Sequence, residues 1–146
     1  MKLADYLTSV REHGPSNALL IEVVIPDPPH GPRCGWSFQK FGRTAVDISL
    51  VNVAAGLQLD ARRRVEWARI ALGAVAAVAT RVPDVEELMI GQTFNSTLLA
   101  EIGAEVMRQV HPITDQRASA EYRRELSRVL TRRALEECAT QAGCSL

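Results

Sequence analysis

The feature that most constrains the fold is the run Ile48–Leu59, which contains no charged residue and is apolar at most positions. A strand of this composition is buried on both faces or lies in the middle of a sheet. Before it, Trp36, Phe38 and Lys40 alternate with other residues, so that these three side chains share one face. We therefore predict two β-strands, joined at the turn Gly42-Arg43-Thr44, around which the rest of the chain is arranged.

Two further stretches have strand character. The β-rich run from Ala18 to Ile25 is ended by Pro26, because proline cannot continue a hydrogen-bonded ladder. The run from Val65 to Leu72 follows Arg62–Arg64, a charged turn that discourages pairing at a sheet edge. Residues 27–32 are rich in proline and predict a stiff, exposed connection. Residues 73–80 are small and apolar, so that strand and coil both remain open there.

The second half of the chain has helical patterning. A short helix is predicted over Pro83–Ile90, because proline suits a first helical position and Gly91 a C-terminal cap. A second helix, capped by Asn95 or Ser96, is predicted over Thr97–Val110. The third spans about residues 118–141 and is stopped by a glycine. Its apolar side is predicted to carry Tyr122, Leu126, Val129, Leu130 and Leu135, and its arginines, Arg123 among them, lie mostly on the other side.

Strands followed by helices are typical of the α+β class. We predict an antiparallel sheet of three to four strands with a three-helix layer on one face. The chain of 146 residues is long enough for one domain with its own core. We place that domain at residues 18–142. Residues 1–17 are predicted to be a lead-in, like an interdomain linker, that packs on something other than this core.

Charge and cysteine content exclude several classes of function. Lysine and arginine balance aspartate and glutamate at 17 each, which argues against a nucleic-acid or membrane-surface protein. The three cysteines form no CxxC pattern and are expected to be free thiols in a reducing cytosol. The three histidines lie far apart in sequence, so no metal site is expected. The N-terminus lacks the apolar run of a signal peptide, and we expect a cytoplasmic protein.

The stripe Trp36, Phe38 and Lys40 is the first candidate site. Two flat apolar side chains beside an ammonium group suit a ring system with an anionic edge, such as a flavin. The structural alternative is that the aromatic side chains belong to the core and Lys40 extends to water. The residues alone favour this second interpretation.

The polar run Asp115–Arg124 is the second candidate. Asp115 can cap a helix, and arginines at a helix start can bind a carboxylate or phosphate through two hydrogen bonds. The alternative is a solvated helix face with ion pairs. Glycine-rich phosphate loops, GxSxG and HExxH are absent, so the sequence lacks the parts of a self-sufficient enzyme.

Several ordered blocks resemble the C-terminal domain of the FAD-binding (medium) subunit of molybdenum hydroxylases, the carbon monoxide dehydrogenase and xanthine dehydrogenase flavoprotein family. The most specific block is DQRASAEYRR at residues 115–124, followed by RAL at residues 133–135. The other blocks are FQKFGR at residues 38–43, VDI at 46–48, VNVA at 51–54, ARIALGAVA at 68–76 and, resembling the tail of the preceding flavin domain, LADY at 3–6.

The resemblance implies an accessory domain that closes an FAD site and docks partner subunits. The partners that it implies are an FAD-binding N-terminal domain or chain, an iron–sulfur subunit and a molybdenum subunit. By position, Lys40 matches the lysine of the family's aromatic-x-lysine strand, Phe38 lies where an aromatic ring covers the flavin, and Trp36 is a weaker candidate because it can face the core. The block at 115–124 is expected to fix the helix layer.

The sequence differs from the family pattern in one respect, because no glycine-rich flavin domain precedes the matched blocks. We therefore expect no tight FAD binding and no catalysis by these residues alone. The alternative function is a freestanding dimerisation or scaffold module of the same fold with no flavin role, and a homodimer is open in either case. A small-ligand protein that uses the arginine cluster is a third class.

Overall fold

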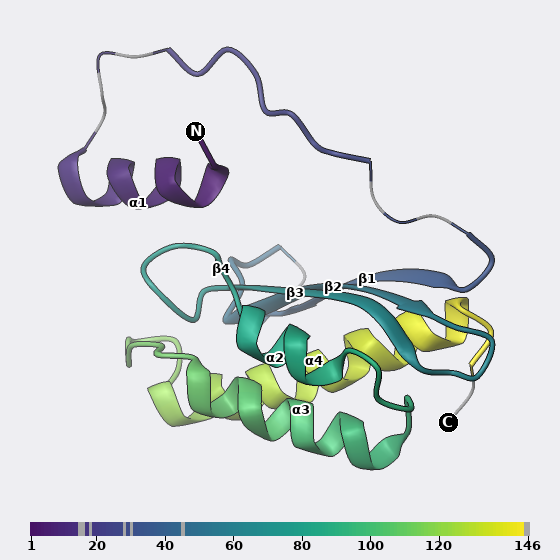
Figure 1. Cartoon of the computed structure of the whole chain (residues 1–146). Coiled ribbons are helices and arrows are strands. Elements are labelled where there is room, and N and C mark those ends of the chain that lie inside the picture. Colours follow the sequence, from purple (N-terminus) through teal and green to yellow (C-terminus); the bar gives the residue numbers. More distant parts are fainter. Residues whose placement is uncertain (15–16, 18, 28, 30, 45, 145–146) are drawn as a thin grey trace.

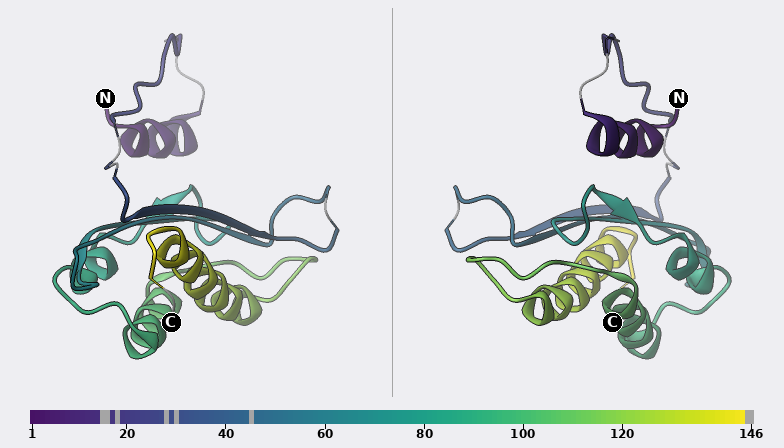
Figure 2. Two further views of the ribbon diagram at one scale, coloured as in Figure 1. Left: turned by 90° about the vertical axis from the view of Figure 1, so that its right-hand side faces the viewer. Right: turned by 90° about the vertical axis from the view of Figure 1, so that its left-hand side faces the viewer.

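The computed structural model describes residues 1–146 except 15–16, 18, 28, 30, 45 and 145–146. Four strands form one antiparallel sheet in the order β1-β2-β3-β4. Helices α2, α3 and α4 lie together on one face of the sheet, and α1 lies on the other side (Figures 1 and 2). The bounds are α1 Leu3–His13, β1 Cys34–Phe41, β2 Val51–Leu59, β3 Val65–Gly73, β4 Thr80–Arg81, α2 Pro83–Met89, α3 Ser96–Gln109 and α4 Ala120–Gln141.

Strand β2 is the centre of the sheet, as its charge-free sequence predicts. It pairs with β1 on one side and β3 on the other, and Val51, Val53 and Leu57 are at most 1% exposed. The register places Trp36 opposite Gly56 and Lys40 opposite Asn52. Since side chains alternate along a strand, the odd-numbered positions of β1 and β2 turn to the helices and the even-numbered ones to the open face.

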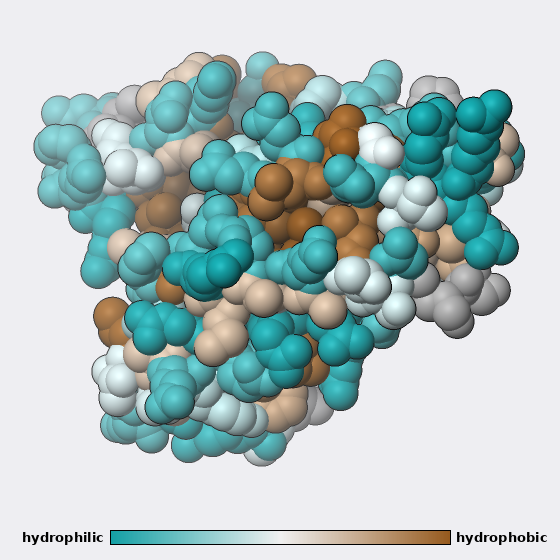
Figure 3. Space-filling model, turned by 60° about the horizontal axis from the view of Figure 1, so that its bottom comes forward, coloured by the Kyte–Doolittle hydropathy of each residue, from teal (hydrophilic) through white to brown (hydrophobic). Residues whose placement is uncertain are grey.

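The helix layer completes the predicted α+β architecture. Helix α4 packs on β1 and β2, α3 packs on α4, and α2 packs on β3. Seen from the helix side, the surface is mostly hydrophilic, with apolar side chains gathered near its middle (Figure 3). The largest side chains of the core, each less than 2% exposed, are Leu57, Ile70, Leu72, Met89, Leu99, Ile102 and Leu135.

Helix boundaries follow the predicted caps, with one change. Asn95 accepts a hydrogen bond from the amide of Leu98 at 2.9 Å, and Gly91 has a positive φ of 78° after α2. Helix α4 is capped by Ser119, which accepts from the amide of Tyr122 at 3.1 Å. The cap that Asp115 was expected to form is therefore provided by Ser119.

The predicted apolar side of α4 is wrong at two positions. Tyr122 is 45% exposed, whereas Arg123, assigned to the polar side, is 5% exposed. The buried face also contains Ser127 and Thr131. Arg123 is buried because carbonyl and carboxylate oxygens surround its guanidinium group, so hydrogen bonds offset the loss of water.

The prediction of a strand over residues 18–25 is wrong for the described part of that run. Residues 19–25 follow an extended path outside the sheet (Figure 1), and the fourth strand is the short β4 at Thr80–Arg81. A strand is stable only where another strand accepts its hydrogen bonds. Within the described residues, no sheet edge pairs with this segment.

A close contact joins β1 to α4. A Cβ built on Gly35 would lie 2.0 Å from the carbonyl oxygen of Cys138, so only glycine lets the strand and helix approach this closely. Around this point Ser37 donates to Glu137 at 2.6 Å, and Gln141 accepts from the amide of Trp36 at 2.9 Å. These contacts fix the orientation of β1 on the helix.

All three cysteines are free thiols. Cys138 lies in the core, and burial raises the pKa of its thiol to about 12, so this thiol stays protonated and unreactive. Among the described residues, no helix is long and apolar enough to cross a membrane.

We predict that Gly35→Ala destabilises the domain by about 1–3 kcal/mol, the usual cost of overpacking, because the added methyl group meets backbone atoms of α4. Gly56→Ala is the comparison variant, since the three atoms nearest its added Cβ are ring carbons of Trp36 and Trp67, which lie on the open face and can shift, and not backbone atoms. Urea unfolding of both variants measures the difference. Equal midpoints for the two variants would contradict the assigned β1–α4 contact.

Candidate functional site

The candidate stripe lies on the open face of the sheet. Trp36 is 44% exposed, Phe38 is 64% exposed, and Lys40 is exposed beyond them on the same face. The interpretation of the two aromatic side chains as core residues is therefore wrong, and so is the concern that Trp36 faces inward. The helices cover the opposite side chains of β1, including Ser37.

Trp36 and Phe38 border an open hollow of about 440 Å³. Its floor consists of small residues of the two central strands, Ala54, Gly56 and Ala71. Small side chains beside large aromatic ones leave a flat, shallow surface. Lys40 does not line this hollow. It borders a second one, of about 290 Å³, at residues 40–44.

Trp36, which lines the hollow, pairs with Trp67 of the neighbouring strand β3. The ring centroids of Trp36 and Trp67 are 5.2 Å apart with planes inclined by 60°, which is an ordinary geometry for a stable aromatic pair. Gly56 lies beneath them, because a Cβ there would be 2.5 Å from the Trp36 ring and 2.8 Å from the Trp67 ring. The guanidinium carbon of Arg69 is 5.2 Å from the Trp67 ring centroid, within cation–π range.

Two arginines on the rim share one buried carboxylate. Glu86 of α2 is 3% exposed, and its carboxylate pairs with Arg81 and lies 3.5 Å from Arg69 Nη1. The Glu86 carboxylate also accepts a hydrogen bond from the backbone amide of Ile70 at 3.0 Å. This β3 amide lies just beyond the two residues that the short strand β4 pairs with, so Glu86 supplies its hydrogen-bond partner. The hydrogen bond to Glu86 raises the pKa of Arg81 above its already high value. Two positive charges against one negative charge leave the hollow with a net positive rim.

Sequence reasoning missed this group. Arg69 and Arg81 lie on different strands, and Glu86 lies five residues after Arg81 across a helix start. Alternation along Val65–Leu72 sets Arg69 on the same face as Trp67, and this is the local signal that could have drawn attention to Arg69. It gives no partner for the arginine.

The hollow offers groups that suit binding. Its lining provides aromatic faces, small apolar floor atoms and guanidinium donors, and the hydroxyl that the described lining residues contribute, that of Ser37, donates to Glu137. A flat ring with an electron-rich or anionic edge fits such a surface through stacking and charge-assisted hydrogen bonds.

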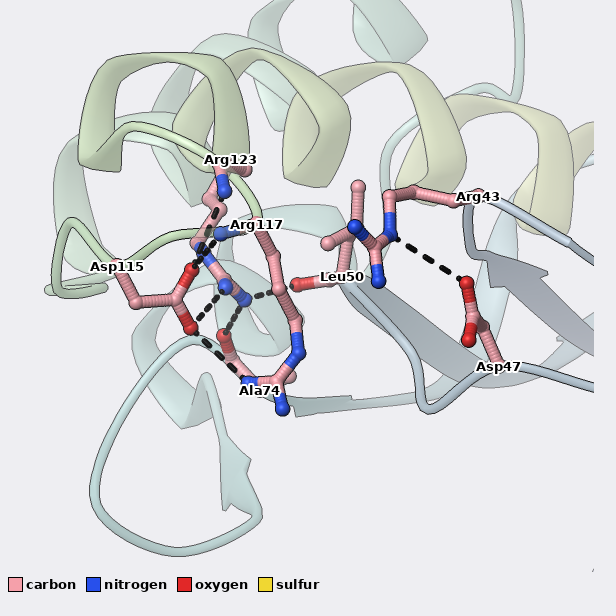
Figure 4. A network of polar contacts seen from close by, with 8 residues as sticks. Arg43, Asp47, Leu50, Ala74, Asp115, Arg117 and Arg123 are labelled. Carbon is pink, nitrogen blue, oxygen red and sulfur yellow. Dashed lines mark hydrogen bonds and ion pairs between the residues drawn. The ribbon is translucent and has the colours of Figure 1, made fainter.

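The second candidate, at the start of α4, is a structural cluster (Figure 4). Arg123 donates to the carbonyl of Leu50 at 2.7 Å and of Ala74 at 3.4 Å, and to Asp115 Oδ2 at 2.9 Å. It therefore ties α4 to the sheet, and the expectation that this block fixes the helix layer is confirmed. The Arg123 side chain is 6% exposed, so its guanidinium group is not accessible to an external phosphate.

Hydrogen bonds in this cluster stabilise the ionised form of Asp115. Its carboxylate accepts from the amides of Arg117 at 2.8 Å and Ala118 at 3.1 Å. The hydrogen bond from the Arg117 amide, followed by that from the Arg123 side chain, lowers the pKa of Asp115 to about 2. The folded domain therefore favours the ionised carboxylate.

A domain with this sheet and helix layer also occurs in solved CO dehydrogenase structures. The sequence matches the family described as the CO dehydrogenase flavoprotein C-terminal domain over residues 36–138. The chain belongs to that family.

Relatives and solved structures agree with this assignment. The chain is 33% identical over 142 residues to the nicotine 6-hydroxylase medium subunit of Paenarthrobacter nicotinovorans, covering 95% of this chain and 46% of the relative. It is 32% identical over 104 residues to the xanthine dehydrogenase FAD-binding subunit of Escherichia coli O157:H7, covering 71% and 35%. A chain of Cu,Mo-CO dehydrogenase superimposes with a TM-score of 0.74 at 26% identity, covering 80% and 40%. The chain thus spans less than half the length of these proteins.

We predict that Glu86→Gln destabilises the domain by about 1.5–3 kcal/mol, the usual contribution of a hydrogen bond to a charged group, because the amide loses its pairing with Arg81 and Arg69. Glu87→Gln, at the exposed neighbouring position, is the control. Thermal unfolding of both variants measures the effect. An equal loss of stability in both variants would show that the charge of the helix, and not the pairing of Glu86 with the two arginines, causes the effect.

We predict that Asp115 makes stability depend on acid pH. Because its folded pKa, about 2, lies below the unfolded value, its contribution is fully present above about pH 4 and is lost as the pH falls through 2. Asp115→Asn should therefore reduce stability at pH 6 and flatten its fall between pH 4 and 2, measured by urea unfolding. Glu101→Gln on the exposed side of α3 is the control and should leave the slope unchanged.

Proposed function

We propose that this domain closes the flavin site of a molybdenum hydroxylase-type oxidoreductase by laying the open face of its sheet against the isoalloxazine ring of FAD. The observation that carries the proposal is the hollow bordered by Trp36 and Phe38, with a floor of small residues and a positive rim. The family is a flavoprotein family, which supports the assignment of FAD.

The residues present fit such a ring. Phe38 offers an aromatic face on the open side of β1, and Gly56 and Ala54 keep the neighbouring floor flat. A hollow of about 440 Å³ is within the range of small-molecule sites, roughly 300–1,000 Å³. The arginine rim suits a ring with carbonyl and anionic edges.

Each side chain then has a defined task. Phe38 and Trp36 exclude water from one face of the ring, and Arg69 and Arg81 add positive potential at its edge. Lys40, two residues beyond Phe38, provides a further charge at the end of the stripe. FAD itself supplies the electron-transfer chemistry, and these residues hold and surround it.

The domain is not proposed to act alone. Its hollow is open on the side away from the sheet, so it contacts only one face of a ring. Most of the binding free energy for FAD is assigned to an FAD-binding N-terminal domain or chain. An iron–sulfur subunit and a molybdenum subunit complete the proposed assembly, in the cytoplasm. The rival function, a scaffold module without flavin, would keep the fold and show no dependence of FAD content on Phe38 or Lys40.

We predict that Phe38→Ala weakens FAD retention in the assembled enzyme by about twofold to tenfold, since an aromatic contact contributes roughly 0.5–1.5 kcal/mol. Lys40→Ala should weaken retention through loss of one charge. The measurement is FAD released on dilution, followed by flavin fluorescence. The purified chain alone should be colourless.

Leu88→Ala and Arg133→Ala are matched controls, because both side chains are exposed on helices, α2 and α4, that lie on the other face of the sheet. Neither control should change FAD retention. Unchanged FAD content and unchanged electron transfer to the acceptor in both Phe38→Ala and Lys40→Ala would refute a flavin role for the stripe.

A further inference from the structure

The outer edge of β1 is a backbone surface that the flavin proposal does not use. In the order β1-β2-β3-β4, β1 is a terminal strand, and among the described residues it pairs only with β2. The strand at the other end, β4, has 2 residues, whereas β1 has 8. An edge strand of this length presents a row of backbone N–H and C=O groups to which another strand can bind.

The hydrogen bonds around β1 define which residues face this edge. Arg33 accepts from the amide of Leu59 of β2 at 3.0 Å, so odd-numbered residues direct their backbone groups at β2. Even-numbered residues direct theirs outward, and accordingly the amide of Trp36 donates to the Gln141 side chain at 2.9 Å. The amide and carbonyl of Phe38 also point outward, and no group among the described residues binds them.

The side chains of β1 match those of a second copy of the same strand. An antiparallel pair with its two-fold axis at Phe38 places the two Phe38 rings opposite each other and Lys40 of each copy opposite Trp36 of the other. Aromatic pairs across strands are stabilising, and an ammonium group over an indole ring is attracted to it.

Charge selects this register over a neighbouring one. Lys40 is the single charged residue of β1. A two-fold axis at Lys40 would place two ammonium groups opposite each other, and like charges at directly opposite positions are destabilising. The axis at Phe38 instead places each charge beside an aromatic ring of the other copy.

We propose that two copies of this domain pair antiparallel through the outer edges of β1, with Phe38 at the two-fold axis, and form one continuous sheet. Gln141 then releases the Trp36 amide, and a carbonyl group of the second strand takes its place. The pairing uses the strand edge, whereas the flavin proposal uses the sheet face, so each can fail without the other.

The second copy also adds a group to the hollow on the open face. Trp36 lines this hollow, but Lys40 of the same copy borders a different one. In the dimer, Lys40 of the second copy lies opposite Trp36. The pairing therefore brings a positive charge to the β1 side of the hollow, which Arg69 and Arg81 border on the other side.

Sedimentation equilibrium of the full chain measures the dimer, and hydrogen exchange followed by NMR locates it. We expect exchange of the Phe38 amide to slow as the protein concentration rises and the dimer forms. The Gln39 amide is the internal control, because it points to β2 and should be protected at every concentration. A chain that stays monomeric at the highest concentration used for NMR, or a dimer with unchanged exchange at Phe38, would overturn the proposal.

Charge variants test the register of the pair. Trp36→Lys opposes like charges across the two strands, and Phe38→Glu opposes two carboxylates, so each should weaken the dimer roughly tenfold. Adding Lys40→Glu to the Trp36→Lys variant opposes unlike charges instead and should restore the dimer. A double variant that dimerises as weakly as Trp36→Lys alone would show that the register is wrong.

Leu88→Glu is the matched control, because it places a charge on an apolar side chain of α2 that is 57% exposed on the other face of the sheet. It should dimerise like the unchanged chain, and an equal weakening by Leu88→Glu and Phe38→Glu would contradict pairing through β1. Thermal unfolding verifies that each variant is folded. Phe38 is 64% exposed, so Phe38→Glu keeps the test available even where Trp36→Lys disturbs the contact with Trp67.

Discussion

The contact between β1 and α4 determines which surface of this domain is open. Gly35 lets the strand reach the Cys138 carbonyl, and Ser37 and Gln141 connect the two elements by hydrogen bonds. With the odd-numbered side chains of β1 held on the helix, the even-numbered ones must face outward. The exposure of Trp36, Phe38 and Lys40 is therefore a consequence of packing on the opposite face, since a one-residue slip would bury all three.

Buried charges hold the remaining elements in place. Glu86 connects α2 to the edge of β3 through the Ile70 amide and pairs with Arg81, and Arg123 connects α4 to the loops at Leu50 and Ala74. In both cases a charged group lies where the sheet ends and backbone groups lack strand partners. An arginine or glutamate satisfies several such groups at once, which explains why charged side chains are buried at the margins of an otherwise apolar core.

The sequence was most informative where one local pattern sufficed. The charge-free run defined β2, alternation defined β1 and β3, and proline and glycine marked the helix ends. It failed where a partner distant in sequence decides the outcome. Residues 19–25 have strand propensity but no sheet edge within the described residues, and Arg123 looks solvent-facing until Leu50 and Asp115 are brought to it. The Glu86 cluster joins two strands and a helix, and no local sequence pattern predicts that residues of three different elements come into contact.

Substitutions on the two faces of the sheet are also expected to differ in how much they change folding stability. Phe38 is 64% exposed, so its removal costs the fold little, whereas Ile70 on the opposite face is fully buried. Variants of the open face therefore separate binding from folding, which variants of the inner face cannot do. Residues 19–25 have the same property, because they lie outside the sheet and their six apolar residues are 53–84% exposed. Substitutions there should therefore change the stability of the sheet and helix layer little, and what they change in binding can be measured separately.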